Sequence, residues 1–116
     1  MRYNLYMHRG PALLYLIYHE KMGAFKVGIN DISNTRYSRH RHNGWKMVDY
    51  WYFDSITIAR KVERIVLSSM KDKIKSEGFV DKKDMPQGGY TETFDAKKMT
   101  STQAKIIINR IIRNLL

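Results

Sequence analysis

The chain has 116 residues and carries 21 lysines and arginines against 11 acidic residues, for a formal net charge of +10. That length suits one domain with a single core, and the charge favours a polyanionic partner, nucleic acid first and an anionic membrane second. The sequence contains no cysteine, which excludes disulfides and thiolate-bound zinc, so any metal must be held by carboxylate, imidazole or water.

The predicted elements begin with a β-hairpin. Residues 12–19 are aliphatic and aromatic, residues 20–24 include a turn glycine, and residues 25–30 alternate. The apolar run at 12–18 is too short to span a bilayer, and the residues before it lack the form of a secretory signal. We therefore expect a soluble, cytoplasmic protein with no membrane segment.

A short basic helix and a third strand follow the hairpin. Ser33 or Asn34 is a suitable N-cap for the helix, whose sequence is TRYSRHRH, and the pair Asn43-Gly44 would end it. Residues 45–53, WKMVDYWYF, are rich in strand formers.

The second half of the chain predicts a long helix, a loop, a short strand and a terminal helix. The long helix is capped by Ser55 and ends before Gly78, at about residue 77. A polar loop then leads into the strand YTETF. Thr100 and Gln103 match a capping box for the amphipathic terminal helix AKIIINRIIRNLL.

Together these elements predict an α+β fold, a single domain over residues 1–116. A three-stranded, mostly antiparallel sheet is flanked by helices in the order ββαβα, and a short strand and a C-terminal helix follow at 88–116. The terminal helix carries an apolar stripe that consists of Ile107, Ile108, Ile111, Ile112 and Leu115. Such a stripe more often closes a monomer's core than forms a dimer seam, so we expect a monomer and keep a homodimer through this helix as the alternative.

Glu63 interrupts the apolar face of the long helix. At about 100° per residue, one broad arc contains Ile58, Ala59, Val62, Ile65, Val66, Leu67, Met70 and Ile74. Glu63 falls inside this arc, and a buried carboxylate costs several kcal/mol unless it is paired, protonated or bound to a cation. Two interpretations stay open: a Glu at the helix border that reaches water or an arginine, which is the more common case, and a metal ligand.

The basic helix offers candidate phosphate ligands. Arg36 and His40 are four residues apart and so share a helix face, as do Arg39 and Asn43. An arginine and an imidazole one turn apart can hold a phosphate between them. The alternative is a solvated basic surface that binds nucleic-acid backbone without chemistry.

The hairpin carries a tyrosine, a lysine and a glycine that could form half of a site. If the strands pair so that Tyr15 and Lys26 share a face, the ammonium lowers the pKa of the phenol, and the phenolate could take a proton from water. Gly28 would let a substrate approach the strand closely. The sequence leaves the register open, and the alternative is cross-strand packing by the tyrosine beside a surface lysine.

In order and spacing, these residues resemble the motifs of the GIY-YIG nuclease family. The sequence LLY at 13–15 stands where the family has GIY, and KVG at 26–28 stands where it has YIG. Arg36 lies eight residues after Gly28, His40 lies four after Arg36, and Glu63 is in the helix sequence ARKVERIVL. The likeness covers residues 12–70, and GYTETF resembles an ending found in a phage-associated branch.

Three positions depart from the family pattern. Leu13 replaces a glycine, which affects the tightness of the strand. Lys26 replaces the second tyrosine; some family members carry lysine there, and in those the first tyrosine is taken as the base. The Asn that often follows the Glu has no clear counterpart, and Gln87 and Glu92 are the two residues that could substitute for it.

The resemblance implies a metal-dependent endonuclease that hydrolyses DNA phosphodiester bonds, in a bacterial cell or a phage-infected host. Tyr15, assisted by Lys26, would be the general base. Arg36 would clamp the phosphate, and His40 would orient the nucleophile or the phosphate. Glu63 would hold one Mg²⁺, or Mn²⁺ in its place, with water filling the other positions.

DNA is the expected partner. The residues expected to contact it are mostly basic: Tyr18, Gly28, Arg39, Arg41, Lys46, Arg60, Lys61 and Arg64. Tyr18 is also expected to form a hydrogen bond in the same site as Tyr15. One alternative is a non-catalytic nucleic-acid-binding module on the same fold, which the Lys26 replacement favours and Glu63 opposes, because a pure binder has no use for a carboxylate aimed at phosphate. The other is a basic protein that docks onto an acidic partner protein.

Overall fold

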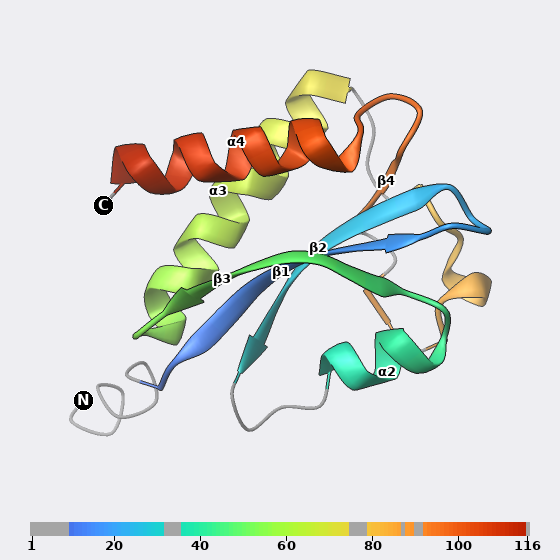
Figure 1. Ribbon diagram of the computed structural model, residues 1–116, viewed down its shortest axis with the longest axis horizontal. Coiled ribbons are helices and arrows are strands. Elements are labelled where there is room, and N and C mark those ends of the chain that lie inside the picture. The colour runs from blue at the N-terminus through green and yellow to red at the C-terminus, as the bar shows by residue number, and fades with distance from the viewer. Residues whose placement is uncertain (1–9, 32–35, 75–78, 87, 90–91, 116) are drawn as a thin grey trace.

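The structure is a computed structural model that describes residues 10–31, 36–74, 79–86, 88–89 and 92–115, with the backbone alone for residues 31 and 36–38. Its strands form one antiparallel sheet in the order β3-β1-β2-β4 (Figure 1). The strands are β1 (Ala12–His19), β2 (Ala24–Asp31), β3 (Lys46–Phe53) and β4 (Thr93–Asp95). The helices are α2 (Arg36–His42), α3 (Ile56–Ile74) and α4 (Ser101–Leu115), and a short 3₁₀ turn, η1 (Lys82–Asp84), precedes β4.

The α+β class and the predicted order of elements are confirmed, with one correction to the sheet. The short strand predicted after the loop joins the sheet as β4, beside β2, so the sheet has four strands over the described residues instead of three. Phe94 of β4 stacks on Phe25 of β2 with ring centroids 5.3 Å apart. This aromatic contact gives a three-residue strand an apolar anchor.

The hairpin register decides which side chains share a face. Gly23, at φ +59°, lies in the turn. Tyr15 pairs with Gly28, and Ile17 pairs with Lys26. Directly opposed residues of antiparallel strands point to the same side, so Tyr15, Lys26 and Gly28 lie on one face. The sequence left open whether Tyr15 and Lys26 share a face, and the register shows that they do.

The two faces of the sheet carry different cores. The main core lies between one face and the helices α3 and α4, and its strand residues include Leu14, Leu16, Phe25 and Val27. The smaller core lies on the other face and contains Tyr15, Ile17, Ala24, Trp45, Val80 and Met85. Helix α2 is on the side of the smaller core, and α3 and α4 are on the side of the main core (Figure 1).

The described helix ends confirm two predicted caps. Ser55 Oγ accepts a hydrogen bond from the backbone N–H of Thr57 at 3.2 Å, at the start of α3. Thr100 and Gln103 make both bonds of the capping box, at 2.9 Å and 3.2 Å. Three other predicted caps lie outside the described residues: Ser33, Asn34 and Gly78.

The apolar faces of the two long helices close the main core. On α3 the predicted arc is wrong at Ile58, which is 40% exposed, and Ile56 at the first position of the helix is buried although it lay outside that arc. On α4, Ile107 and Ile108 are buried, whereas Leu115 at the end of the helix is exposed. No helix among the described residues is long and apolar enough to cross a membrane.

Candidate active site

Tyr15 and Lys26 meet above Gly28 on the sheet face that α2 covers. All three residues are buried, and the lysine ammonium lies 5.4 Å from the centre of the tyrosine ring. A Cβ on Gly28 would lie 2.5 Å from the Tyr15 hydroxyl oxygen and 2.8 Å from Lys26 Nζ. Both functional atoms thus converge on one point, and only a glycine at position 28 leaves that space for them.

The role of Gly28 therefore differs from the expected one. We expected the glycine to let a substrate approach the strand. In the structure the space above it holds the phenol of Tyr15 and the ammonium of Lys26. The missing side chain admits two groups of the chain itself, and contact of Gly28 with nucleic acid stays a prediction.

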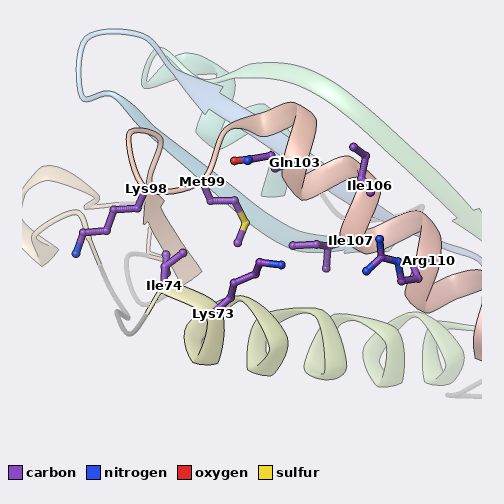
Figure 2. A pocket seen from close by; sticks show the side chains of 8 residues that line it. All are labelled: Lys73, Ile74, Lys98, Met99, Gln103, Ile106, Ile107 and Arg110. Carbon is purple, nitrogen blue, oxygen red and sulfur yellow. The ribbon is translucent and has the colours of Figure 1, made fainter.

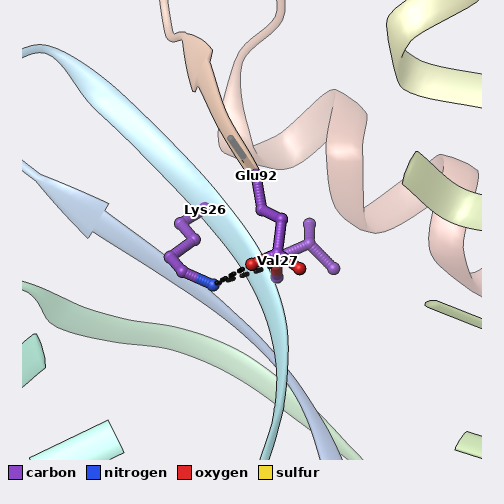
Figure 3. A network of polar contacts seen from close by, with 3 residues as sticks. All are labelled: Lys26, Val27 and Glu92. Atoms are coloured by element: carbon purple, nitrogen blue, oxygen red, sulfur yellow. Dashed lines mark hydrogen bonds and ion pairs between the residues drawn. The ribbon is translucent and has the colours of Figure 1, made fainter. Parts of the chain in front are cut away.

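Glu92 is the charge partner of Lys26 (Figure 3). Lys26 Nζ donates to Glu92 Oε1 at 3.2 Å and to the carbonyl oxygen of Val27 at 3.3 Å. The lysine side chain is fully buried, whereas that of Glu92 is 23% exposed. Because a buried ammonium is costly without an opposite charge, Glu92 stabilises Lys26 in its charged form beside Tyr15.

His40 completes the cluster from α2. Its ring is buried, and the ring centroid lies 6.1 Å from that of Tyr15. A Cβ on Gly89 would lie 3.2 Å from Lys26 Nζ and 3.5 Å from His40 Cε1, so the backbone at Gly89 passes close to both side chains. We call Tyr15, Lys26, His40 and Glu92 the Tyr15 cluster.

Gly89 is a residue of this site that we expected only as part of a loop. Its φ of +89° lies in the region that favours glycine, and a Cβ there would also lie 2.5 Å from Lys26 Cε. The available signal in the sequence was the pair Gly88-Gly89 directly before the short strand.

The C-terminal end of α2 holds His40 in place. The His40 carbonyl oxygen accepts hydrogen bonds from the backbone N–H groups of Asn43 at 2.9 Å and Trp45 at 3.1 Å. Gly44, at φ +92°, lets the chain turn there, as the sequence predicted. The turn buries Trp45, whose indole N–H has no hydrogen-bond partner among the described residues. A free donor therefore lies inside the smaller core.

The other residues expected to contact DNA are divided between the two sides of the sheet. Arg39 and Arg41 are exposed on α2, on the side of the Tyr15 cluster, and Lys46 is exposed at the start of β3. Tyr18 packs against the main core, so the structure does not bring it to Tyr15. The side chain of Arg36 lies outside the described residues. The exposed cations of α3, on the opposite side, are Arg60, Lys61 and Arg64.

Glu63 is half-buried on α3 and so belongs to the layer opposite Tyr15 and Lys26. Its carboxylate is a donor of the type that Mg²⁺ prefers, and this ion is commonly held by one or two carboxylates with water and phosphate oxygens. Within the described part of the chain, no three His, Asp or Glu side chains gather as a metal-binding group. Glu63 thus suits a hydrated ion by its chemistry.

A groove of about 330 Å³ lies between the end of α3 and the start of α4 (Figure 2). Its cations are Lys73, Lys98 and Arg110, and its other lining residues are Ile74, Met99, Gln103, Ile106 and Ile107. None of these eight side chains is a carboxylate, an imidazole or a phenol, so the groove contains no general base. The Tyr15 cluster is the better candidate for chemistry.

Comparisons with protein-family models, curated proteins and solved structures give no significant match. Function is therefore inferred from the chemistry of the chain's own residues. The Tyr15 cluster combines a phenol, an ammonium and an imidazole, which are groups that transfer protons or bind phosphate.

Three of the four side chains of the Tyr15 cluster are closed to solvent in this structure, and Glu92 is partly exposed. Tyr15, Lys26 and His40 have no exposed surface. The smaller core that encloses Tyr15 includes Trp45, Val80 and Met85. A phosphate can reach the phenol only if some of the covering residues move.

Proposed function

We propose that the chain is a DNA endonuclease of GIY-YIG type in which Tyr15 is the general base. The observation that carries the proposal is the convergence of the Tyr15 hydroxyl and the Lys26 ammonium above Gly28. A neighbouring ammonium favours the phenolate form of a tyrosine, and a phenolate can take a proton from an attacking water. The water oxygen then bonds to phosphorus, and the bond from phosphorus to the leaving deoxyribose oxygen breaks.

The other members of the cluster act around this proton transfer. Lys26 stabilises the negative charge on Tyr15, and Glu92 is a positioning residue that acts through Lys26. His40 orients the water or the phosphate, and Arg36 clamps the phosphate and meets its developing charge. Arg39 and Arg41 bind the backbone phosphates of the DNA.

Glu63 would hold Mg²⁺ or Mn²⁺. When bound, the ion supplies charge neutralisation on the phosphate and stabilisation of the leaving oxygen. The support for this role is the half-buried carboxylate of Glu63 on a helix that is otherwise apolar toward the sheet.

A nucleic-acid-binding module without catalysis is the second candidate, and the burial of the Tyr15 cluster favours it. A closed polar cluster can be structural, because buried polar groups that satisfy one another specify a core. The net charge of +10 and the exposed Arg39 and Arg41 suit DNA binding in either case.

A plasmid-nicking assay separates the two candidates. Tyr15→Phe keeps the buried ring and removes only the hydroxyl, so we expect the rate to fall by about 10²- to 10⁴-fold, the usual contribution of a general base. Tyr18→Phe is the matched control, because Tyr18 lies in the same strand and packs against the other face. Its rate should equal that of the wild type.

The metal role of Glu63 is tested in the same assay. Cutting should require Mg²⁺ or Mn²⁺, stop with a chelator and be lost in Glu63→Ala. Cutting that survives Glu63→Ala would show that this residue does not hold the metal. A wild type that binds DNA and cuts no duplex, single-stranded, branched or modified DNA with either ion would refute the nuclease and leave the binding module.

A further inference from the structure

Two tyrosines of β3 are exposed on the same sheet face as the Tyr15 cluster. Tyr50 is 56% exposed and Tyr52 is 59% exposed. Tyr50 pairs with Tyr15 across β3 and β1, and Tyr52 pairs with Leu13, so both side chains leave the sheet on the side of Tyr15. Trp51, between them, points the other way and packs against the main core.

The charge on this side of the sheet suits a polyanion. Helix α2, on this side of the sheet, carries the exposed Arg39 and Arg41 on either side of the buried His40 along the chain. The one carboxylate of β3 belongs to Asp49, which pairs with Lys105 of α4 at 3.6 Å on the opposite face. On the face of Tyr15, β3 therefore presents two phenol rings and no negative charge.

The spacing of the two rings matches unstacked bases. Residues two apart on a strand lie about 7 Å from each other, which is about twice the 3.4 Å spacing of stacked bases along a duplex strand. Each ring can therefore take a base only where the bases have separated. Base faces are free in single strands and are covered by neighbouring bases in a duplex.

We propose that Tyr50 and Tyr52 form a stacking platform for the bases of single-stranded DNA beside the Tyr15 cluster. The platform rests on the proposed function for DNA as the ligand and deepens it by naming the substrate class, DNA with an unpaired segment. Because Tyr50 is the cross-strand partner of Tyr15, a base stacked on Tyr50 brings the adjoining phosphate toward the general base, which the phosphate reaches once the covering residues move. The arginines of α2 bind the backbone of the same strand.

Fluorescence anisotropy tests the platform with a labelled single strand and a blunt duplex of the same sequence, in a chelator so that no strand is cut. Tyr50→Ala and Tyr52→Ala should each weaken single-strand binding by about 5- to 150-fold, the range for loss of one stacked base. Duplex affinity should not change. Tyr50→Phe and Tyr52→Phe keep the rings and should bind as the wild type does.

Phe79→Ala is the matched control for removal of an exposed aromatic ring. Phe79 is 41% exposed, and its backbone N–H bonds to Thr93 of β4, at the opposite edge of the sheet from β3. This variant should bind single strands as the wild type does. A 2-aminopurine base in the oligonucleotide reports stacking directly: its fluorescence should be quenched by the wild type and the Phe variants, and not by the Ala variants of the platform.

Several outcomes would overturn the platform. If the Ala variants bound single strands as tightly as the wild type, the two rings would not contact the bound DNA. If the Ala variants lost affinity equally for single strands and duplex, the tyrosines would contact the DNA backbone or stabilise the fold and would not stack on bases. If the wild type bound an RNA strand of the same sequence more tightly than the DNA strand, RNA would be the ligand of the platform. A wild type that binds single-stranded DNA through Tyr50 and Tyr52 and cuts nothing with Mg²⁺ would keep the platform and refute the nuclease.

Discussion

Replacing Gly28 by alanine tests the geometry of the Tyr15 cluster without any assumption about function. The added Cβ would lie 2.5 Å from Tyr15 Oη, 2.7 Å from Tyr15 Cζ and 2.8 Å from Lys26 Nζ, all closer than non-bonded atoms approach. At least one buried group must move, and overpacking of a close-packed interior costs about 1–3 kcal/mol. In an unobstructed strand position the same change would instead stabilise by about 0.5–1 kcal/mol, because glycine loses more backbone entropy on folding.

The measurement is equilibrium unfolding in urea, with Gly10→Ala as the matched control. Among the described residues, nothing lies within 4 Å of a Cβ on Gly10, so the free energy of unfolding of Gly10→Ala should change by no more than about 0.5 kcal/mol. Gly28→Ala should lower the free energy of unfolding by about 1–3 kcal/mol at an unchanged m-value. A stability equal to or above that of the wild type would refute the convergence of Tyr15 and Lys26, since the site would then have room for a methyl group.

Three further predictions concern the ion pair, a helix cap and the basic surface. Glu92→Gln removes the carboxylate charge that pairs with the Lys26 ammonium and should lower the free energy of unfolding by about 1–3 kcal/mol in urea; no loss would mean that the pair does not stabilise Lys26. Thr100→Ala removes the cap of α4 and should cost about 1 kcal/mol, whereas the exposed Thr102→Ala should cost nothing; equal effects would contradict the cap. Arg39→Ala should weaken duplex binding regardless of sequence and reduce the slope of log K against log salt by about 1. An unchanged slope would show that Arg39 does not contact a phosphate.

The elements of the fold could be predicted wherever a local signal and the tertiary packing agree. The capping box of Thr100 and Gln103 and the turn at Gly44 are contained in a few consecutive residues, and both appear as expected. The place of β4 in the sheet could not be predicted, because that strand is held by Phe94 against Phe25, a contact between distant segments. No local pattern encodes such a pairing.

In the candidate site, too, the contacts within one hairpin could be predicted and the contact with a distant segment could not. Tyr15, Lys26 and Gly28 belong to one hairpin, so alternation along two adjacent strands was enough to suggest that they meet. Glu92 joins Lys26 from 66 residues away, and nothing in the spacing indicates that contact.

Tyr18 and Glu63 were both expected at the site of Tyr15, but both belong to the layer on the other face of the sheet. Tyr18 is three residues from Tyr15 on one strand, so alternation alone directs it to the other face, and this signal was available in the sequence. Glu63 is half-buried on α3, as its place within the apolar arc of the helix predicted. The periodicity of a helix shows which of its faces is apolar, but it does not show which face of a sheet that helix will cover.

The ion pair of Lys26 and Glu92 is the feature that bears most on whether the Tyr15 cluster is more than structural. A buried lysine contributes little to stability relative to an apolar side chain of similar volume even when it is paired, because its charge loses its hydration. Ile17, the cross-strand partner of Lys26, shows that this part of the sheet accepts an apolar residue. A core that served stability alone would do as well with a second apolar side chain at position 26. The ammonium instead lies 5.4 Å from the centre of the Tyr15 ring, and the His40 ring centroid lies 6.1 Å from that of Tyr15; this is the neighbourhood that the proposed general base would use.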